Sequence, residues 1–277
     1  MKKAAVVGGS SGIGLAISRN LADRGYFVEV LSRTPPENGI LPKDSFRHTY
    51  CNLLDFDEEL FYKLAEDRDV EILMISAGIG RVADFESFHT AEIEKVFTVD
   101  TVSAIKIFRI FYDRINSREA FYSCIMGSIA GWMSSPAMAV YAAAKAGVVR
   151  FVESVNIELE VAGTENRILD VSPASFKGSK FAGGKNDLSL TGPLAEEIVS
   201  RLFARETLYI PQYEETFKAV LERYHDDPHE YCIKRYNYKK EAGRIDNSKK
   251  VVIGYLSGTF DLFHIGHLNL LKRAKEQ

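Results

Sequence analysis

The chain has 277 residues, and 46% of them are hydrophobic, so it can bury the core of one large domain or two modest ones. Its 35 basic and 38 acidic residues give a formal net charge of −3, which predicts no general attraction to nucleic acid or to an anionic membrane surface. No apolar run approaches the length of a membrane span, and the run 4–7 is too short for a signal peptide. Together with three scattered cysteines, Cys51, Cys124 and Cys232, these features indicate a cytoplasmic protein.

The first 175 residues alternate short apolar runs with helical patterns. Apolar runs that favour β-strands lie at 4–7, 26–31, 70–75, 121–126 and 167–172. Helical spacing occurs between them, at about 13–24, 56–68, 90–115 and 139–162. Strands that are apolar on both faces and alternate with helices are typical of a parallel, doubly wound sheet. We therefore expect an α/β fold of three layers, with helices on both faces of the sheet.

The pattern changes after Pro173. The sequence SFKGSKFAGGKNDLSLTG is rich in Gly, Ser and Lys and predicts a mobile loop. A helix at about 191–204 and a short strand at 207–210 follow. Residues 211–248 then predict one amphipathic helix and a polar stretch that ends in a linker, before a new strand and helix at 251–256 and 265–276. We expect three parts, with the boundaries 1–210, 211–248 and 249–277.

The first predicted strand runs directly into the sequence VGGSSGIG, whose glycines are spaced G-x3-G-x-G. Gly8 permits a tight turn, Gly12 lets the backbone approach a pyrophosphate, and Gly14 allows close packing of the helix. The helix N-terminus adds free N–H groups and positive partial charge. Any tight strand–helix turn can carry glycines, but the position after the first strand favours dinucleotide binding. The predicted phosphate-binding loop also contains Ser10, Ser11 and Ile13.

The end of the second predicted strand indicates which nicotinamide cofactor binds. An acidic residue there would accept a hydrogen bond from the ribose 2′-hydroxyl of NAD. The chain has Ser32 and Arg33 instead. The guanidinium of Arg33 can pair with a 2′-phosphate through two hydrogen bonds, although a solvated surface arginine is the alternative. We therefore favour NADP, with NAD as the second choice.

A candidate catalytic group lies in the sequence SIAGWMSSPAMAVYAAAK. Tyr141 and Lys145 are four residues apart in a helical pattern, so they share one face. A lysine ammonium beside a phenol favours the phenolate, which makes Tyr141 a candidate proton donor to a carbonyl or acceptor from an alcohol. Ser128, thirteen residues upstream at the end of a strand, can hydrogen-bond the same oxygen. Alone, Y-x3-K is common on helix surfaces, but with the serine and the glycine loop it indicates a catalytic site.

These pieces together resemble the short-chain dehydrogenase/reductase family over about residues 1–210. Further matches are Ser76-Ala77-Gly78, after the predicted strand at 70–75, and Pro173-Ala174, after the one at 167–172. The resemblance implies a Rossmann-type sheet and hydride transfer to or from a nicotinamide, with Tyr141 as acid/base. It also implies that Lys145 holds the nicotinamide ribose and that Ser128 positions the substrate. The remaining cofactor contacts that the resemblance suggests are Asn52, Leu53, Ala77, Gly78, Pro173, Ala174 and Phe176.

Four positions depart from the family pattern. The family's Asn-Asn-Ala-Gly is here Ile75-Ser76-Ala77-Gly78, its adenine-capping Asp is Asn52, and its Pro-Gly is Pro173-Ala174. Asp100 replaces the helix asparagine that usually supports the catalytic lysine through water. A carboxylate accepts a hydrogen bond but donates none, and we expect it to hold Lys145 charged more firmly. The proton donor and the cofactor loop remain, so we predict an active enzyme.

The loop after Pro173 occupies the position of the family's substrate lid. It contains Lys177, Lys180 and Lys185, which could close on an anionic substrate such as a phosphate. The alternative is a solvated loop whose charges have no such role. Trp132, the only tryptophan, lies soon after Ser128, and its position is compatible with either the pocket lining or the core.

The last residues, from GTFDLFHIGH onward, resemble the opening of a cytidylyltransferase of the glycerol-phosphate type. In that family a strand ends in Gly-Thr-Phe-Asp and His-x-Gly-His begins a helix, so the resemblance gives His264 and His267 the role of facing nucleotide phosphates. Such a domain needs on the order of 100 residues to enclose a core, and residues 249–277 supply 29. We therefore expect a truncated second domain that does not perform this chemistry.

The leading hypothesis is an NADP-dependent reductase that acts on a small carbonyl, such as a ketose or polyol phosphate that feeds surface-polysaccharide synthesis. The alternatives are a polyol-phosphate cytidylyltransferase, which would need a complete second domain, and a non-catalytic NADP-binding protein. The family resemblance implies a homodimer or homotetramer built from the helices at about 90–115 and 139–162. We expect no metal and no nucleic-acid or membrane partner.

Overall fold

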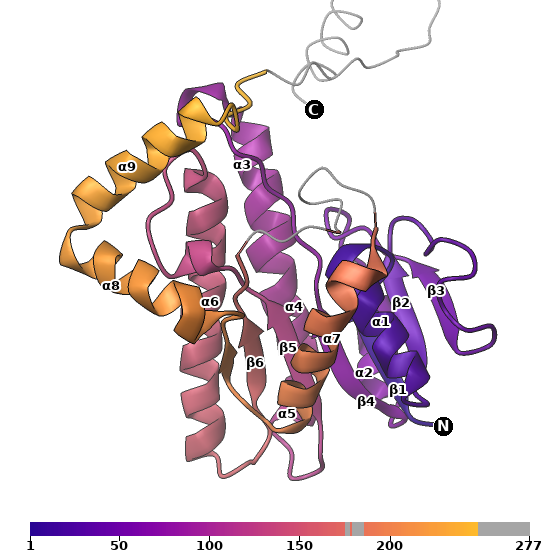
Figure 1. The fold of residues 1–277 in the computed structure, drawn as a ribbon. Coiled ribbons are helices and arrows are strands. Elements are labelled where there is room, and N and C mark those ends of the chain that lie inside the picture. Colours follow the sequence, from indigo (N-terminus) through magenta and orange to yellow (C-terminus); the bar gives the residue numbers. More distant parts are fainter. Residues whose placement is uncertain (175–177, 179–185, 249–277) are drawn as a thin grey trace, which may run out of the picture.

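The computed structural model describes residues 1–174, 178 and 186–248 (Figure 1). Within them, seven parallel strands form one sheet in the order β3-β2-β1-β4-β5-β6-β7. The chain order reverses between β1 and β4, which makes this the switch point of a doubly wound sheet. The strands are β1 (Lys3–Val7), β2 (Phe27–Ser32), β3 (Phe46–Tyr50), β4 (Val70–Ile75), β5 (Tyr122–Met126), β6 (Ile168–Val171) and β7 (Leu208–Tyr209).

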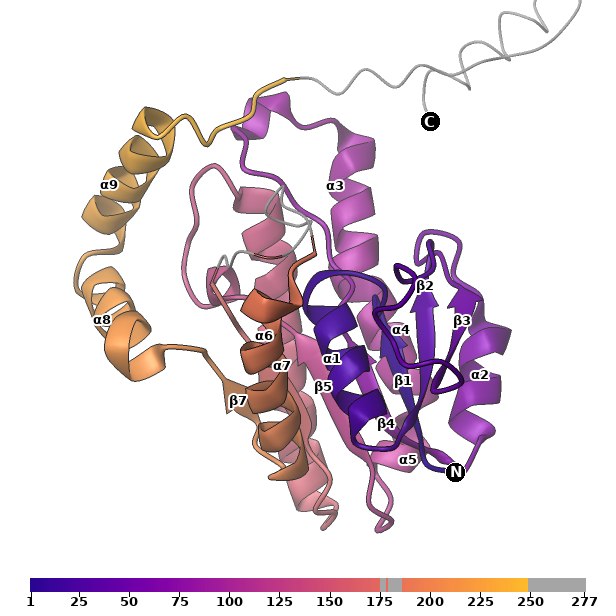
Figure 2. The same ribbon diagram turned by 45° about the vertical axis from the view of Figure 1, so that its right-hand side comes forward.

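Helices cover both faces of this sheet, as the views in Figures 1 and 2 show. Strands β1 and β4 are buried almost throughout, which is why their sequences, KAAVV and VEILMI, carry apolar residues on both faces. The helices are α1 (Gly12–Asp23), α2 (Glu58–Glu66), α3 (Thr90–Phe97), α4 (Ser103–Ile110), α5 (Tyr112–Ile115), α6 (Ala139–Val161), α7 (Leu188–Phe203), α8 (Lys218–Asp226) and α9 (Pro228–Glu241).

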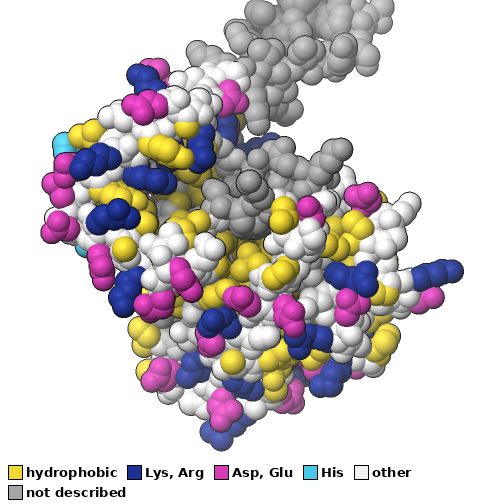
Figure 3. Space-filling view, viewed as in Figure 1, with side chains coloured by type: hydrophobic (Ala, Val, Ile, Leu, Met, Phe, Trp, Pro, Cys, Tyr) yellow, Lys and Arg dark blue, Asp and Glu magenta, His cyan; other side chains and the backbone are white. Residues whose placement is uncertain are grey.

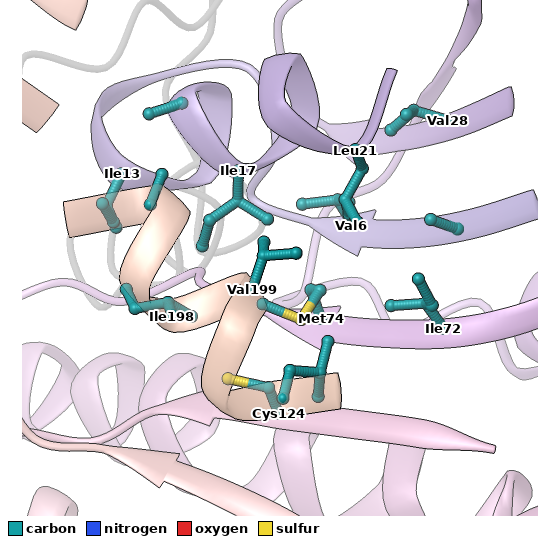
Figure 4. Close-up of a cluster of buried hydrophobic side chains, with 14 of the residues drawn as sticks. Val6, Ile13, Ile17, Leu21, Val28, Ile72, Met74, Cys124, Ile198 and Val199 are labelled. Atoms are coloured by element: carbon teal, nitrogen blue, oxygen red, sulfur yellow. The ribbon is translucent and has the colours of Figure 1, made fainter. Parts of the chain in front are cut away.

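Two hydrophobic clusters, one on each side of the sheet, form the core. On one side, α1 and α7 pack against strand residues such as Val6, Met74 and Cys124 (Figure 4). On the other side, α2, α4, α5 and α6 pack against the opposite side chains of the same strands. The α/β fold of three layers predicted from the sequence is therefore confirmed. Among the described residues, no helix has both the length and the apolar character needed to cross a lipid bilayer.

The sequence analysis missed strand β3. Its residues, FRHTY, are exposed or only partly buried. It pairs with β2 alone, at the edge of the sheet, so it needs no continuous apolar run. A polar edge strand leaves little hydrophobic signal in a sequence.

The predicted helix at 90–115 is interrupted. It consists of α3, a π-helical turn at Thr98–Val102, and the helices α4 and α5. The insertion of a π turn shifts the helix face by about one residue, and such turns are frequent at functional sites. Asp100 lies within this turn, so the irregular segment carries one of the predicted site residues.

Residues 211–248 differ from the prediction of one helix followed by a polar stretch. They form two helices, α8 and α9, which extend from β7 toward the segment before α3 (Figures 1 and 2). Helix α9 begins at Pro228, and the carboxylate of Asp227 accepts a hydrogen bond from the backbone N–H of Glu230 at 2.9 Å. An aspartate at the N-cap followed by proline is a helix start signal, and it marks α9 although this helix has no regular apolar face.

Candidate active site

A cleft of about 1800 Å³ lies at the carboxyl ends of the central strands. Its lining includes Val7 at the end of β1, Ser76 after β4, Met126 at the end of β5 and Pro173 after β6. Ligands of doubly wound sheets bind in this position, beside the switch point between strands. The glycine loop lines the same cleft as Ser128, Tyr141 and Lys145, so the fold brings together residues from 8 to 174.

The glycine loop has the geometry predicted for phosphate binding. Gly8 and Gly12 have φ angles of +83° and +53°, which favour glycine. A Cβ atom on Gly8 would lie 2.6 Å from the backbone nitrogen of Ala77, and one on Gly14 would collide with the Ser76 hydroxyl and the Gly8 carbonyl. The loop therefore packs directly against the segment after β4, and only glycine fits at these positions.

The N-terminus of α1 opens at Gly12, with Ser11 as its N-cap. The backbone N–H of Gly12 donates a hydrogen bond to Oδ1 of Asn186, at 2.9 Å. Asn186 directly precedes the N-cap residue of α7, so the segment before α7 reaches the phosphate-binding loop. In this structure an amide oxygen therefore takes the position of an acceptor at the helix N-terminus, where a phosphate oxygen would bind.

The other predicted cofactor residues also border this cleft. Arg33 is exposed at the end of β2, and it has no hydrogen-bond or ion-pair partner within the described part of the chain. Asn52 and Leu53 follow β3, where Oδ1 of Asn52 accepts a hydrogen bond from the N–H of Leu54 at 3.2 Å. A cradle that only glycine fits and a free guanidinium suit a dinucleotide with an additional phosphate. Such a cofactor would supply or accept a hydride.

The buried ammonium of Lys145 is the centre of the predicted catalytic group. Its Nζ donates to the carbonyl oxygen of Met126 at 2.8 Å, and it lies 5.7 Å from the centre of the Tyr141 ring. Both residues come from the first turns of α6 and line the cleft. A Cβ atom on Gly80 would lie 2.7 Å from Cδ2 of Tyr141, so this glycine lets the loop after β4 pack closely against the phenol ring.

Asp100 pairs directly with this lysine. Its Oδ2 lies 3.3 Å from Nζ of Lys145, while its Oδ1 accepts a hydrogen bond from the N–H of Ile79 at 2.8 Å. Burial acts to lower the pKa of Lys145, but its electrostatic interactions, above all with the carboxylate of Asp100, outweigh burial and leave the pKa raised. This direction agrees with the expectation that Asp100 holds Lys145 in its charged form.

Ser128 is held by a short 3-10 helix, Ile129–Gly131. Its Oγ accepts a hydrogen bond from the N–H of Ala130 at 3.2 Å, and its side chain lies in the lining of the cleft. A Cβ atom on Gly131 would lie 2.8 Å from the Lys145 carbonyl oxygen. The close packing of this helix on α6 fixes Ser128 relative to Lys145.

A second buried carboxylate was not predicted from the sequence. Asp170, on β6, accepts a hydrogen bond from the Ser172 hydroxyl at 2.9 Å, and that hydroxyl accepts one from Nε1 of Trp132 at 3.1 Å. Burial raises the pKa of Asp170 to about 6, although Ser172 and Lys145 act against the shift. The indole of Trp132 thus ties the segment after Ser128 to β6.

The extension after β7 contributes a wall of the cleft, which the sequence analysis also missed. Lys239 donates to the Ser135 hydroxyl at 3.1 Å, and Tyr236 donates to Asp84 at 2.9 Å. The residues that it adds to the cleft lining are Thr216, Phe217, Val220, Tyr231, Arg235, Lys239 and Arg244. Nothing in their spacing connects them with the glycine loop, because only tertiary contacts bring them there.

Several predicted residues lie outside the described part of the chain. They are Phe176, Lys177, Lys180, Lys185, His264 and His267.

The short chain dehydrogenase family matches residues 2–187, which include the whole glycine loop and the catalytic group. The chain belongs to the short-chain dehydrogenase family. A second family, described as cytidylyltransferase-like, matches residues 255–277, as the resemblance of this segment predicted. The family assignment made from the sequence is therefore confirmed, and so is the likeness of the C-terminal segment to a cytidylyltransferase.

Curated members of the short-chain dehydrogenase family share about three tenths of their aligned residues with the chain. The uncharacterized oxidoreductase TDA5 of Saccharomyces cerevisiae is 29% identical, over 69% of the chain and 60% of its own length. Carbonyl reductase family member 4 of Xenopus tropicalis is 29% identical, over 76% of the chain and 93% of its own length. The chain spans about three fifths of the length of TDA5 and of the dehydrogenase RED2 of Cochliobolus heterostrophus.

Solved structures support the same fold. An alcohol dehydrogenase from Thermococcus sibiricus, complexed with 5-hydroxy-NADP, aligns with a TM-score of 0.65 at 20% identity, over 76% of the chain and 95% of its own. A short-chain dehydrogenase from Sphingobium yanoikuyae, in complex with NADPH, aligns with a TM-score of 0.64 at 18% identity. The alignment covers 82% of the chain and 96% of that dehydrogenase. At these identities the likeness concerns the fold.

Proposed function

We propose that the chain is an NADP(H)-dependent reductase that transfers a hydride between the cofactor and a small carbonyl or alcohol. The observation that carries the proposal is that Ser128, Tyr141 and Lys145 line the same cleft as the glycine loop. The phenol and the ammonium lie close together, so Tyr141 can give a proton to a carbonyl oxygen or take one from an alcohol. In this proposal Ser128 positions that oxygen and Lys145 maintains positive charge beside the phenol.

In this proposal the chain binds NADP in preference to NAD. Arg33 stands at the end of β2 without a partner in the described regions, where its guanidinium is available to a 2′-phosphate. The relatives from Thermococcus sibiricus and Sphingobium yanoikuyae are described with NADP-type cofactors, which supports the same choice.

We further propose that the carbonyl belongs to a ketose phosphate or another precursor of a polyol phosphate. The cytidylyltransferase-like segment at 255–277 supports this, because that chemistry would activate a polyol phosphate as its CDP derivative. Surface-polysaccharide synthesis is the setting that joins the two steps. Cys51, Cys124 and Cys232 are free thiols, which suits the reducing conditions of the cytoplasm.

A homodimer or homotetramer is also part of the proposal. Val102 at the end of the π turn and Ile157 and Val161 in α6 are 45%, 64% and 84% exposed. These apolar side chains belong to the two helical segments that the sequence analysis assigned to subunit contacts. Light scattering on the purified chain measures the number of subunits directly.

Replacement of the proposed proton donor tests the reaction. In Tyr141→Phe, NADPH should still bind, while reduction of a carbonyl panel that includes ribulose 5-phosphate and dihydroxyacetone phosphate should fall by about 10²-fold or more, since proton transfer is lost. Tyr62→Phe, an exposed tyrosine on α2, is the matched control. An unchanged rate in Tyr141→Phe would reject the mechanism, and NADPH binding without turnover of any carbonyl by the natural chain would indicate a non-catalytic cofactor-binding protein.

A further inference from the structure

Lys239 is a buried cation that has no anionic partner among the described residues. The residue is 9% exposed, on α9, and it lines the active-site cleft. Its Nζ donates to the Ser135 hydroxyl at 3.1 Å and to the Pro136 carbonyl oxygen at 2.7 Å, both of which are uncharged. No carboxylate of the described residues forms an ion pair with it. The ammonium has one N–H left beyond these two bonds.

Burial of an unpaired charge is costly, so such a group either loses its charge or meets an opposite one. Desolvation, together with the neighbouring positive charge of Arg235, lowers the pKa of Lys239 to about 8. At neutral pH the side chain therefore remains largely protonated, at a site that disfavours its charge. An anion bound beside it would relieve this penalty.

Two arginines accompany Lys239 in the lining of the cleft. Arg235 and Arg244 lie with their guanidinium carbons 5.5 and 5.3 Å from the centre of the Tyr238 ring, so one aromatic side chain holds both. Both arginines are exposed and have no carboxylate partner in the described part of the chain. In the space-filling view, Lys and Arg side chains lie over α8 and α9 together with Asp and Glu side chains (Figure 3).

The balance of charge in the whole cleft favours anionic ligands. Among its described lining residues, the only carboxylate is Glu92, and Arg81 holds it at 2.7 Å. The cations Arg33 and Lys145 belong to the cofactor and catalytic regions already described. Lys239 and its two arginines come from α9 and the residues after it, which lie away from β2 (Figure 1), so the cofactor's 2′-phosphate does not account for them.

The extension is docked on two loops that border the cleft. The N–H of Asp246 donates to the Val82 carbonyl oxygen at 2.8 Å, and Tyr236 donates to Asp84 at 2.9 Å. Lys239 itself contacts the loop between Ser128 and Tyr141. Contacts to both loops hold α9 beside the cleft that Tyr141 also lines.

We propose that Lys239, Arg235 and Arg244 form an anion subsite that binds the phosphate of a phosphorylated carbonyl substrate while its carbonyl group lies at Tyr141. The identity of the substrate's reacting group rests on the proposed function, whereas the binding of the anion does not. The subsite would select phosphorylated substrates over their uncharged parents, because each charge-assisted hydrogen bond to the phosphate strengthens binding.

Two measurements test the subsite. The first is calorimetric titration of inorganic phosphate into the whole chain, with NADP present at saturation to occupy the cofactor region. The second is the ratio of kcat/KM for a ketose phosphate to that for the unphosphorylated ketose. In Lys239→Met, phosphate binding and this ratio should each fall by roughly 10- to 100-fold, as expected for the loss of a charged hydrogen-bond donor. The kinetic loss should appear in KM.

Lys239→Met also removes two contacts between α9 and the loop, so a second variant is needed. The double variant Arg235→Met/Arg244→Met changes exposed side chains and should cause a comparable loss of phosphate binding without unfolding. Lys234→Met, an exposed lysine of the same helix that pairs with Glu230, is the matched control and should bind phosphate like the natural chain.

The outcomes distinguish a failure of the proposed anion subsite from a failure of the proposed reductase function. Phosphate binding that depends on Lys239, in a chain that reduces no carbonyl, would keep the subsite and reject the proposed function. Carbonyl reduction with no preference for phosphorylated substrates, and phosphate binding that neither variant changes, would overturn the subsite and leave the reductase in place.

Discussion

Lys145 and Asp100 form a buried ion pair in which Nζ and Oδ2 lie 3.3 Å apart and the side chains are 3% and 0% exposed. The lysine comes from α6 and the aspartate from the π turn between α3 and α4. In the family pattern, an asparagine at this position supports the catalytic lysine through a water molecule. Here a direct charge pair takes its place, and it sets the protonation of the group beside Tyr141.

Replacement of Asp100 should therefore affect both stability and pH dependence. Removal of one partner from a buried pair costs about 3–5 kcal/mol, so Asp100→Ala should lower the free energy of unfolding by about that amount. In Asp100→Asn, burial of Lys145 is no longer opposed by the carboxylate, so the pKa of Lys145 should fall. The basic limb of the pH profile of kcat/KM should then move to lower pH.

Urea denaturation and pH-rate profiles measure these effects. Glu59→Ala, which breaks the exposed pair of Glu59 with Lys63, is the control and should change neither stability nor pH profile appreciably. A pH profile of Asp100→Asn that coincides with that of the natural chain would show that the carboxylate does not act on Lys145.

Asp170 should make stability depend on pH in the acidic range. Its pKa is raised from 3.8 to about 6 in the folded chain, because burial disfavours the carboxylate. Between these values the folded state binds more protons than the unfolded state, so this group's contribution to stability falls as pH rises from 4 to 6. A rise of the pKa from 3.8 to about 6 corresponds to about 3 kcal/mol.

Comparison with Asp170→Asn isolates this contribution. The free energy of unfolding of the natural chain, measured relative to the variant, should decrease between pH 4 and pH 7 by up to about 3 kcal/mol. Asp55→Asn, which changes an exposed carboxylate, serves as the reference substitution. A constant difference between the natural chain and Asp170→Asn across this range would contradict the expectation.

Arg33 should determine the choice of cofactor. Loss of its charged hydrogen bonds to a 2′-phosphate should cost about 1.5–3 kcal/mol, so Arg33→Ala should weaken NADPH binding by about 10- to 100-fold. Binding of NADH, which lacks this phosphate, should change little. Steady-state KM values for both cofactors provide the measurement.

Arg24→Ala, at the end of α1 and outside the cleft lining, is the control for loss of a positive charge. If Arg33→Ala changed the KM values for NADH and NADPH equally, the guanidinium would not bind the 2′-phosphate.

Local sequence signals were sufficient for the central strands and the glycine loop. Gly8 and Gly14 were identified because their positions require an absent side chain, and the structure shows what a Cβ atom would strike. Tyr141 and Lys145 were identified because a spacing of four places them on one helix face. These features depend on residues near each other in the chain.

The features that were missed depend on contacts between distant segments. Strand β3 is polar because it lies at an edge, and Asp170 resembles any polar residue in a strand until its burial is known. Lys239 lies 94 residues after Lys145, and no pattern connects them; only the docking of α9 on the loop at Ser135 brings Lys239 to the cleft.

By itself, the sequence determined the α/β architecture and the family, and it predicted the residues that we propose as the catalytic group, since hydrophobic periodicity and short motifs encode these features locally. The tertiary structure decided that Asp100 meets Lys145 directly, that Asp170 is buried, and that the extension supplies cations to the cleft. The physical reason is that burial and charge pairing are properties of the packed chain, and residues far apart in sequence acquire them only when the layers assemble.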